Sequence, residues 1–291
     1  MKPAPFKYIA ATTLQQALSL KAEHGDEAKF LAGGQSLMPA MNFRLARPAV
    51  LIDINGVDEL AGVRRDAGGV RIGALRRYHQ LQRDADLIGD YPLLGEALPH
   101  IAHPQIRNRG TIGGNLCHAD PASELPALMV ALRARLRTRS TSDERWIDAS
   151  DFFVGSLTTD LAGDEMLVEI ELPSLTPGTG SCFQEVARRR GDFAIVGVAA
   201  MITLADDNTC SAIRLTFCGV GETPVDASPQ AAALVGHPVT EARIAMVAEE
   251  IADMIEPAGS VHATADYQRH VAGVLTERAL TTANQRACNG R

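Results

Sequence analysis

Two pairs of adjacent glycines, Gly33–Gly34 and Gly113–Gly114, each lie beside short polar side chains in this chain. The first pair ends the apolar run "AKFLAGG" and is followed directly by Gln35 and Ser36. Glycine has no Cβ, so it can adopt a positive φ and let a ligand approach the backbone closely. Consecutive backbone N–H groups turned to one side bind anions, and a following helix N-terminus adds partial positive charge. The first loop therefore predicts a phosphate or pyrophosphate site, with a plain tight turn as the alternative.

The second pair lies in "NRGTIGGNLCHADPASELP", between Thr111 and Asn115. A polar run that ends at Glu124 then leads into an apolar helix. Two such loops indicate one long ligand held from two sides, and a dinucleotide with a central pyrophosphate has that shape. The chain contains neither G-x-G-x-x-G nor G-x-x-x-x-G-K followed by Ser or Thr. That absence disfavours a Rossmann dehydrogenase and a P-loop NTPase.

A third candidate is "RRRGDFAIVG", in which Asp192 and Phe193 follow Gly191. An aromatic ring beside a carboxylate could border a flat ligand ring and accept a hydrogen bond. The residues alone slightly favour the alternative, a turn that starts a strand and directs Phe193 into the core.

Metal-binding and hydrolytic patterns are weak in this sequence. His100, His103 and His118 match no common zinc spacing, and no G-x-S-x-G elbow is present. The cysteines are five, an odd number, and form no C-x-x-C pair: Cys117, Cys182, Cys210, Cys218 and Cys288. We therefore predict no metal site in this chain, and reduced thiols in a cytoplasmic protein.

The overall charge points away from nucleic acid. The formal net charge is −7, whereas a nucleic-acid binder usually carries a basic face. The basic clusters from Arg133 to Arg139 and from Arg188 to Arg190 are interpreted as solvated or partner-facing surfaces. We find no apolar run of about 18 residues and no secretory signal pattern, so we predict no membrane span.

The elements that must position these loops alternate between helix and strand. Thr12 and Gln15 form a capping-box pattern that predicts a helix ending at Gly25. A strand over 28–34 and a helix over 36–46 follow, and residues 79–102 read as one helical segment.

The last third changes character. Three strands over 182–189, 193–205 and 210–221 predict an antiparallel meander. Thr240 can cap a helix that Pro257 ends, and a further helix starts near Ala265.

The predicted fold class is α+β in three parts. We expect a first subdomain over 1–56, a second over 57–176 and a C-terminal domain over 177–291.

Longer stretches around these loops resemble a known family. "AGGQSLMPAMNFRLARP" and "TIGGNLCHADPASELPAL" are similar to the paired flavin-binding motifs in the medium subunit of molybdenum hydroxylases, the xanthine dehydrogenase and carbon monoxide dehydrogenase family. The similarity continues through "DEMLVEIELP", "RRRGDFAIVGVAA", "GVGETPVDA" and "ADYQRHVAGVLTERAL" and so covers nearly the whole chain.

The resemblance implies an FAD-binding fold of the vanillyl-alcohol-oxidase-like (PCMH-type) class. Two α+β subdomains would hold FAD between them, beside a C-terminal three-stranded sheet with a helical bundle. The backbone of the first motif would surround the pyrophosphate, and the other residues would line the rest of the pocket. The implied cofactor-binding residues are Leu31, Ala32, Gly33, Gly34, Gln35, Ser36, Leu37, Met38, Ile101, Ala102, Gly110, Thr111, Ile112, Gly113, Gly114, Asn115, Glu124, Leu167, Asp192 and Phe193.

The resemblance also implies partner chains. A small subunit would carry two [2Fe–2S] clusters and a large one the molybdenum cofactor, in a heterohexamer with two copies of each chain. Electrons would pass from the clusters through FAD to an external acceptor, and this chain would contribute no catalytic residue to the hydroxylation. The substrate and the acceptor are not encoded in these motifs.

One residue departs from the family pattern. Relatives often carry a lysine in the strand before "RRRGD", where this chain has Glu185. The reduction potential of a flavin responds to charge near its ring, so the residue at this position affects that potential.

Two alternatives to this function remain: a self-sufficient flavin oxidoreductase, with Ser181 or Cys182 as conceivable proton donors, and a non-catalytic scaffold subunit.

Overall fold

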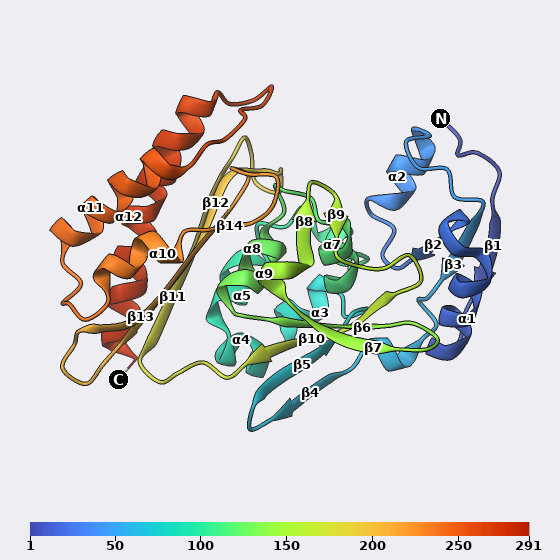
Figure 1. The fold of residues 1–291 in the computed structure, drawn as a ribbon, viewed down its shortest axis with the longest axis horizontal. Helices are drawn as coiled ribbons and strands as arrows, with labels where there is room; N and C mark the ends of the chain where they lie inside the picture. Colours follow the sequence, from blue (N-terminus) through green and yellow to red (C-terminus); the bar gives the residue numbers. More distant parts are fainter. Residues whose placement is uncertain (291) are drawn as a thin grey trace.

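The chain forms three units in a row, each built on its own β-sheet (Figure 1). The computed structural model describes residues 1–290. The N-terminal unit lies at one end and the C-terminal helices at the other, with the remaining unit between them. The predicted α+β class is confirmed.

The N-terminal unit is a three-stranded parallel sheet in the order β1-β3-β2. Its strands are β1 (Lys7–Ala10), β2 (Ala28–Leu31) and β3 (Val50–Asp53). The connections are the helices α1 (Leu14–His24) and α2 (Leu37–Asn42), with short 3-10 turns η1 (Gly25–Glu27) and η2 (Asp58–Leu60). Parallel strands need such crossovers, and these place the loop after β2 at one end of the sheet.

The start of α1 differs from the prediction by one residue. Thr13, not Thr12, is the N-cap, and its hydroxyl accepts a hydrogen bond from the Gln16 N–H. Gln16 completes the reciprocal arrangement, because its Oε1 accepts from the Thr12 N–H at 2.9 Å. The sequence contained two threonines and two glutamines in register, and side-chain geometry selected the second pair.

The middle unit is a five-stranded antiparallel sheet in the order β4-β5-β10-β6-β7. Its strands are β4 (Val63–Asp66), β5 (Gly69–Gly73), β6 (Arg135–Arg139), β7 (Glu144–Asp148) and β10 (Met166–Pro173). A small hairpin pairs β8 (Phe153–Gly155) with β9 (Thr158–Thr159). The helices of this unit are α3 (Tyr78–Arg83), α4 (Ala85–Asp90), α5 (Pro92–Ala97), α6 (Pro104–Arg107), α7 (Ile112–His118), α8 (Glu124–Ala131) and α9 (Ala149–Phe152).

The single helical segment predicted over 79–102 is wrong. The structure divides it into α3, α4 and α5. Asp84 ends α3 and caps α4 by accepting from the Leu87 N–H, and Pro92 occupies the first turn of α5. Aspartate at an N-cap and proline in a first turn both favour a new helix start, which the apolar periodicity concealed.

The C-terminal unit contains the predicted antiparallel meander of β11 (Thr179–Ala187), β12 (Ala194–Leu204) and β13 (Cys210–Cys218). A two-residue strand, β14 (Val225–Asp226), extends the sheet to four strands. Its helices are α10 (Ser228–Ala231), α11 (Glu241–Met254) and α12 (Ala265–Asn289), with a 3-10 turn η3 (Ala232–Leu234). Thr240 caps α11, as predicted. No helix within residues 1–290 has the length and apolar character needed to cross a bilayer.

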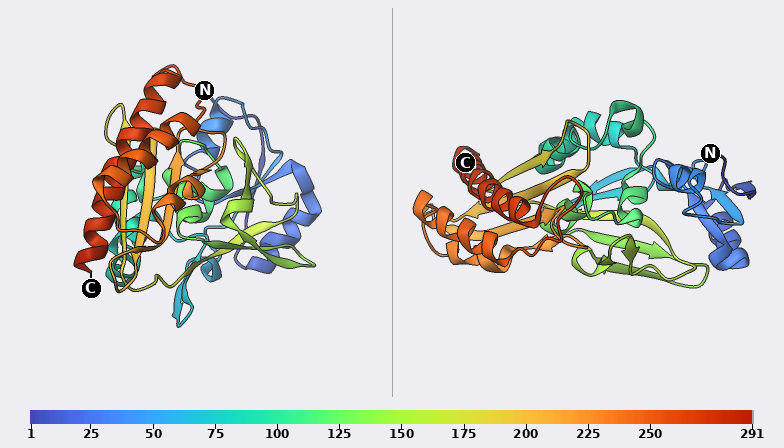
Figure 2. Two further views of the ribbon diagram at one scale, coloured as in Figure 1. Left: turned by 60° about the vertical axis from the view of Figure 1, so that its left-hand side comes forward. Right: turned by 90° about the horizontal axis from the view of Figure 1, so that it is seen from above.

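The sheet of the C-terminal unit is buried on both faces (Figure 2). Val198, Ala200 and Ile202 of β12 pack into the core formed with α11 and α12. The alternate residues Ala199 and Met201 pack into the core of the middle unit. Because successive strand side chains point to opposite faces, this one strand joins two cores and fixes the C-terminal unit against the middle one.

Helix α12 lies directly against the backbone of Gly180 in β11, so we predict that Gly180→Ala destabilises the protein. The added Cβ would overlap the Ala283 carbonyl and the Ala287 N–H of α12. Overpacking of this kind costs about 1–3 kcal/mol, which lowers the melting temperature by roughly 2–12 °C. Thermal unfolding compared with Gly62→Ala, where nothing lies within 4 Å of the added Cβ, tests this. Equal melting temperatures for the two variants would show that α12 yields freely.

Candidate functional site

The first glycine loop connects β2 to α2, and its carbonyl groups are already bonded within the protein. The Gln35 side-chain amide donates to the Gly33 carbonyl at 2.9 Å. The Asn55 amide donates to the Ala32 carbonyl at 2.8 Å, and the Ile54 N–H donates to the Leu31 carbonyl. Gly34 has a φ of +70°, in the left-handed region that favours glycine.

Unlike the carbonyl groups, the N–H groups of the same loop have no bonding partner in the described part of the chain. The amides from Gly33 to Ser36 donate to no acceptor within residues 1–290. Backbone N–H groups are strong donors that folded proteins rarely leave unpaired. Four consecutive unpaired donors beside bonded carbonyls form a cradle for an anion, and this fits a phosphate or pyrophosphate group.

The two glycine motifs touch each other, which the sequence alone could not show. A Cβ on Gly33 would overlap the Arg109 carbonyl and lie 2.9 Å from the Cα of Gly110. Gly114 lies opposite Ala32, whose Cβ would be 3.8 Å from an added Cβ. Gly33 is therefore required for contact between the loops, whereas Gly34 is required for backbone conformation.

The second glycine pair does not repeat the anion cradle. Gly113 and Gly114 lie within the first turn of α7, and neither has a positive φ. The Gly113 N–H donates to the Ala74 carbonyl at 2.9 Å, and the Gly114 N–H donates to Thr111 Oγ1 at 3.1 Å. Gly113 is small because Ala74 of the neighbouring segment lies against it, with its Cβ 2.5 Å from an added Cβ. The interpretation of this loop as a second nest is wrong, since its amides are already bonded.

A buried polar network continues from α7. The Ser123 hydroxyl donates to Asn115 Oδ1 at 2.9 Å, and the Tyr78 hydroxyl also hydrogen-bonds Asn115. Burial raises the pKa of Tyr78 well above its ordinary value, so its hydroxyl keeps its proton. Ser123 precedes Glu124, the buried first residue of α8. Asn115 and Glu124 are thus joined through one serine.

A third group of predicted residues meets where the C-terminal unit contacts the middle one. Ala102 has a φ of +45°, which is unfavourable for a residue with a Cβ. The Arg107 guanidinium holds it there by donating to the Ala102 carbonyl at 2.7 Å and to the Ile101 carbonyl at 2.9 Å. On the other side lies Gly191, where an added Cβ would be 2.7 Å from the Ala102 carbonyl.

Asp192 and Phe193 directly follow Gly191; the first is held by an ion pair, and the second is exposed to solvent. Phe193 is 64% exposed, so the interpretation that placed it in the core is wrong. Asp192 forms an ion pair with Arg188 at 2.8 Å. Burial alone would raise the pKa of Asp192, but the Phe193 N–H and Arg188 lower it overall. An ionised acceptor and an exposed aromatic ring therefore stand together at the edge of this contact.

Leu167 lies in β10 and is 3% exposed. A backbone hydrogen bond joins it to Cys117 of α7, and burial raises the pKa of that thiol to about 12. Cys117 is therefore a neutral packing residue. Leu167 therefore lies beside α7, the helix that contains the second glycine pair.

Sequence reasoning missed three residues that shape the site. Asn55 holds the carbonyls of the first loop, Arg107 holds Ala102, and Tyr78 bonds Asn115. A signal existed for Asn55, because an amide directly after a buried strand commonly bonds nearby backbone. The roles of the other two depend on tertiary contacts.

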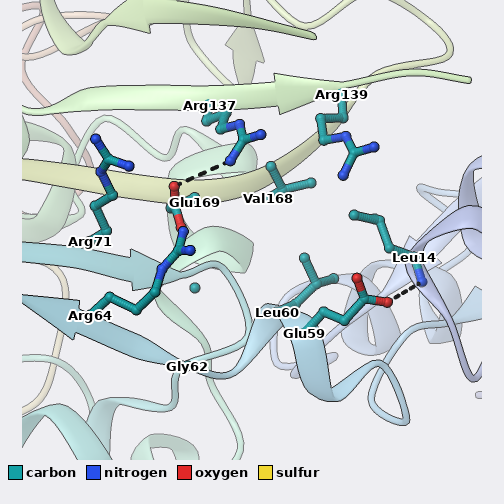
Figure 3. Close-up of a pocket in the computed structure, with 11 residues that line it drawn as sticks. Leu14, Glu59, Leu60, Gly62, Arg64, Arg71, Arg137, Arg139, Val168 and Glu169 are labelled. Atoms are coloured by element: carbon teal, nitrogen blue, oxygen red, sulfur yellow. Dashed lines mark hydrogen bonds and ion pairs between the residues drawn. The ribbon is translucent and has the colours of Figure 1, made fainter. Parts of the chain in front are cut away.

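A polar pocket of about 280 Å³ lies elsewhere, between η2 and the sheet of the middle unit (Figure 3). Its arginines are paired with glutamates: Arg64 with Glu169, Arg71 with Glu171, Arg137 with both Glu144 and Glu169, and Arg139 with Glu144. None of the predicted cofactor-binding residues lines it. We interpret its charges as a structural ion-pair network across the strands.

The three histidines near the second glycine motif, His100, His103 and His118, do not meet in one site. His103 packs against Gly191, His118 ends α7, and Nδ1 of His100 lies 3.8 Å from Oε1 of Glu185. Across residues 1–290, no three or more His, Cys, Asp or Glu side chains are grouped to hold a metal ion.

Two protein families match consecutive parts of the chain. Residues 4–175 match the FAD binding domain in molybdopterin dehydrogenase. Residues 181–283 match the CO dehydrogenase flavoprotein C-terminal domain.

Relatives of known activity match over nearly the full length. The alpha subunit of the 6-hydroxypseudooxynicotine dehydrogenase complex of Paenarthrobacter nicotinovorans is 40% identical, over 99% of this chain and 97% of its own. The beta subunit of caffeine dehydrogenase from Pseudomonas sp. (strain CBB1) is also 40% identical, over 98% and 97%.

Solved structures agree with this fold. A chain of carbon monoxide dehydrogenase from Hydrogenophaga pseudoflava superposes with a TM-score of 0.95 at 37% identity, covering 98% of this chain and 99% of that one. A chain of quinoline 2-oxidoreductase from Pseudomonas putida 86 gives 0.93 at 36% identity and 99% coverage of both.

The contact between the two glycine loops yields a second prediction. Gly33→Ala places a methyl group against the Arg109 carbonyl, so the loops must separate. We expect a loss of about 1–3 kcal/mol in stability and faster amide hydrogen exchange over residues 109–114. Gly89→Ala is the matched control, because nothing lies within 4 Å of its Cβ. Unchanged exchange over 109–114 in Gly33→Ala would contradict the contact.

Proposed function

Because the chain belongs to the FAD-binding medium subunits of the molybdenum hydroxylase family, we propose that it passes electrons from [2Fe–2S] clusters of a partner subunit through FAD to an external acceptor. The family predicted from the sequence is confirmed, and the chain is a flavoprotein subunit of an oxidoreductase. The route of the electrons and the acceptor are the proposed part.

The observation that carries the proposal is the set of four free amides from Gly33 to Ser36. We assign the FAD pyrophosphate to these donors, within the motif from Leu31 to Met38. The carbonyl groups of Ala32 and Gly33 already accept hydrogen bonds within the protein, so they do not repel an anion bound at the amides. When bound, FAD supplies a redox centre that takes up and releases two electrons.

We assign the remaining contacts to the residues that converge around the two loop contacts. Gly110 and Gly114 lie next to Gly33 and Ala32 of the first motif, and the Ala102 carbonyl lies next to Gly191, which precedes Asp192 and Phe193. Leu167 lies beside Cys117 of α7, and Glu124 directly follows Ser123, whose hydroxyl bonds Asn115. In this proposal the chain binds and orients the flavin and sets its electrostatic surroundings, and no residue of it reacts with the substrate.

The same reasoning assigns the other redox groups to partner chains. The five cysteines are free and none forms a cluster-binding group within residues 1–290. We propose a small [2Fe–2S] subunit and a large molybdenum-cofactor subunit, assembled as a heterohexamer. Free thiols also support a reducing, cytoplasmic setting.

The substrate is assigned to the large subunit. Relatives of very similar fold belong to enzymes named for carbon monoxide and quinoline, which differ widely in chemistry. A subunit whose shape is nearly the same in both is suited to a shared step, and electron transfer is such a step.

The structure disfavours the self-sufficient oxidoreductase. Cys182 is 2% exposed and packs in the core between the sheet and α12. Burial raises the pKa of its thiol, and Ser181 beside it is also buried. Neither side chain is available to donate a proton to a flavin-bound substrate. A scaffold without cofactor would leave the four amides unused.

Purification of the native complex tests the proposal first. We expect a flavin absorbance spectrum together with iron–sulfur absorbance, and two further chains by mass spectrometry. A colourless chain would favour the scaffold. A yellow chain that runs alone and reduces a small molecule unaided would favour the self-sufficient enzyme.

Gly34→Ala tests the assigned pyrophosphate site. Alanine at a φ of +70° is strained by about 1–2 kcal/mol, and relief of that strain would move the loop amides. We expect the dissociation constant for FAD to rise roughly tenfold or more, measured by flavin fluorescence titration.

The matched control is Gly236→Ala, because Gly236 has a φ of +78° and open space around its Cβ in the C-terminal unit. It carries the same backbone strain and should leave FAD affinity unchanged. Equal affinity in both variants would place the pyrophosphate elsewhere.

A further inference from the structure

Two buried carboxyl groups lie close together, one at the start of α8 and the other on β11. Glu124, at the start of α8, is 5% exposed, and the Glu185 side chain on β11 is 2% exposed. The two side chains lie within hydrogen-bond reach of each other. Two ionised carboxylates repel strongly in such a setting, and a hydrogen bond between them requires a proton on one of them.

The groups around this acid pair, Glu124 and Glu185, supply no full positive charge at high pH. Asp120 from the loop before α8 and the buried Cys218 thiol of β13 interact with the pair, and the Tyr78 hydroxyl of α3 faces Glu124. A further titratable neighbour is His100, whose Nδ1 lies 3.8 Å from Oε1 of Glu185.

Two further observations describe the pair. Oε2 of Glu185 is buried and has no hydrogen-bond partner among residues 1–290. Burial, and then the charge of Glu185, raise the pKa of Glu124 from its ordinary 4.5 to about 8. A buried carboxyl group without a cationic partner is retained most easily as the neutral acid.

The acid pair lies near two of the residues assigned to flavin binding, Asn115 and Ile101. On one side, Ser123 links Glu124 to Asn115 of the second glycine motif. On the other side, Glu185 contacts His100, which directly precedes Ile101. Because the two carboxyl groups themselves are buried, water screens their charge weakly at the residues next to them.

We propose that Glu124 and Glu185 share one proton and thereby set the negative charge beside the flavin. The pair carries one negative charge while the proton is held and two when the proton has left to the solvent. Extra negative charge disfavours addition of electrons to the flavin, so loss of the proton lowers the flavin potential. The inference rests on the proposed function, because it takes FAD to occupy the pocket.

The first test concerns the pair itself and needs no cofactor. A carboxyl group whose folded pKa is raised stabilises the fold fully below about 4.5 and loses that contribution as the pH rises through about 8. Glu124→Gln cannot ionise, so its melting temperature relative to the wild type should increase steadily from pH 5.5 to pH 8.5.

Glu249→Gln is the control for this test, because Glu249 is exposed on α11. Its melting-temperature difference from the wild type should stay constant with pH. A difference for Glu124→Gln that is equally constant would show that the pair holds no proton and would overturn the proposal.

The second test is the midpoint potential of bound FAD, measured from pH 6 to pH 9 in the full complex. We expect the wild-type potential to fall increasingly below that of Glu124→Gln as the pH passes about 8, with convergence at low pH. A structural effect alone would give the same offset at every pH and would overturn the coupling. Absence of FAD from the complex would instead refute the proposed function, while the melting-temperature test still decides whether the pair holds a proton.

Discussion

The contact of Gly33 with the backbone of Arg109 and Gly110 is the constraint on which the site depends. It brings the loop of the parallel sheet against the loop of the middle unit without any side chain between them. The hydrogen bonds from Asn55 and Gln35 then occupy the loop carbonyls and leave the amides free. The close backbone approach, the paired carbonyls and the free amide donors occur together in this one loop, and their combination gives the loop its anion-binding character.

The two glycine pairs look alike in sequence and serve different physical needs. In the first pair, Gly34 needs a positive φ and Gly33 needs the absence of a Cβ. In the second, Gly113 sits inside a helical turn because Ala74 leaves no room for a side chain. Sequence reasoning located both loops but assigned one mechanism to both, since composition does not distinguish conformational freedom from close packing.

Local sequence signals therefore predicted the fold class and the positions of the glycine loops better than the helix boundaries and the exposure of single side chains. The meander and the Thr240 cap follow from nearby residues and are confirmed, whereas the anion site at the first loop stays a prediction that the free amides support. The break of 79–102 into three helices and the exposure of Phe193 depend on tertiary contacts or on caps hidden within an apolar pattern. Family resemblance supplied FAD, which spacing alone could not distinguish from another dinucleotide.

The acid pair is where this chain departs from the expectation that the family resemblance raised. That resemblance suggested a lysine at the position of Glu185, whose side chain is buried beside Glu124. A lysine there would neutralise the Glu124 carboxylate as an ion pair, at the desolvation cost of two buried charges. With Glu185, a proton shared by the two carboxyl groups takes the place of the lysine charge. Because this proton can leave as the pH rises, the net charge of the pair changes with pH.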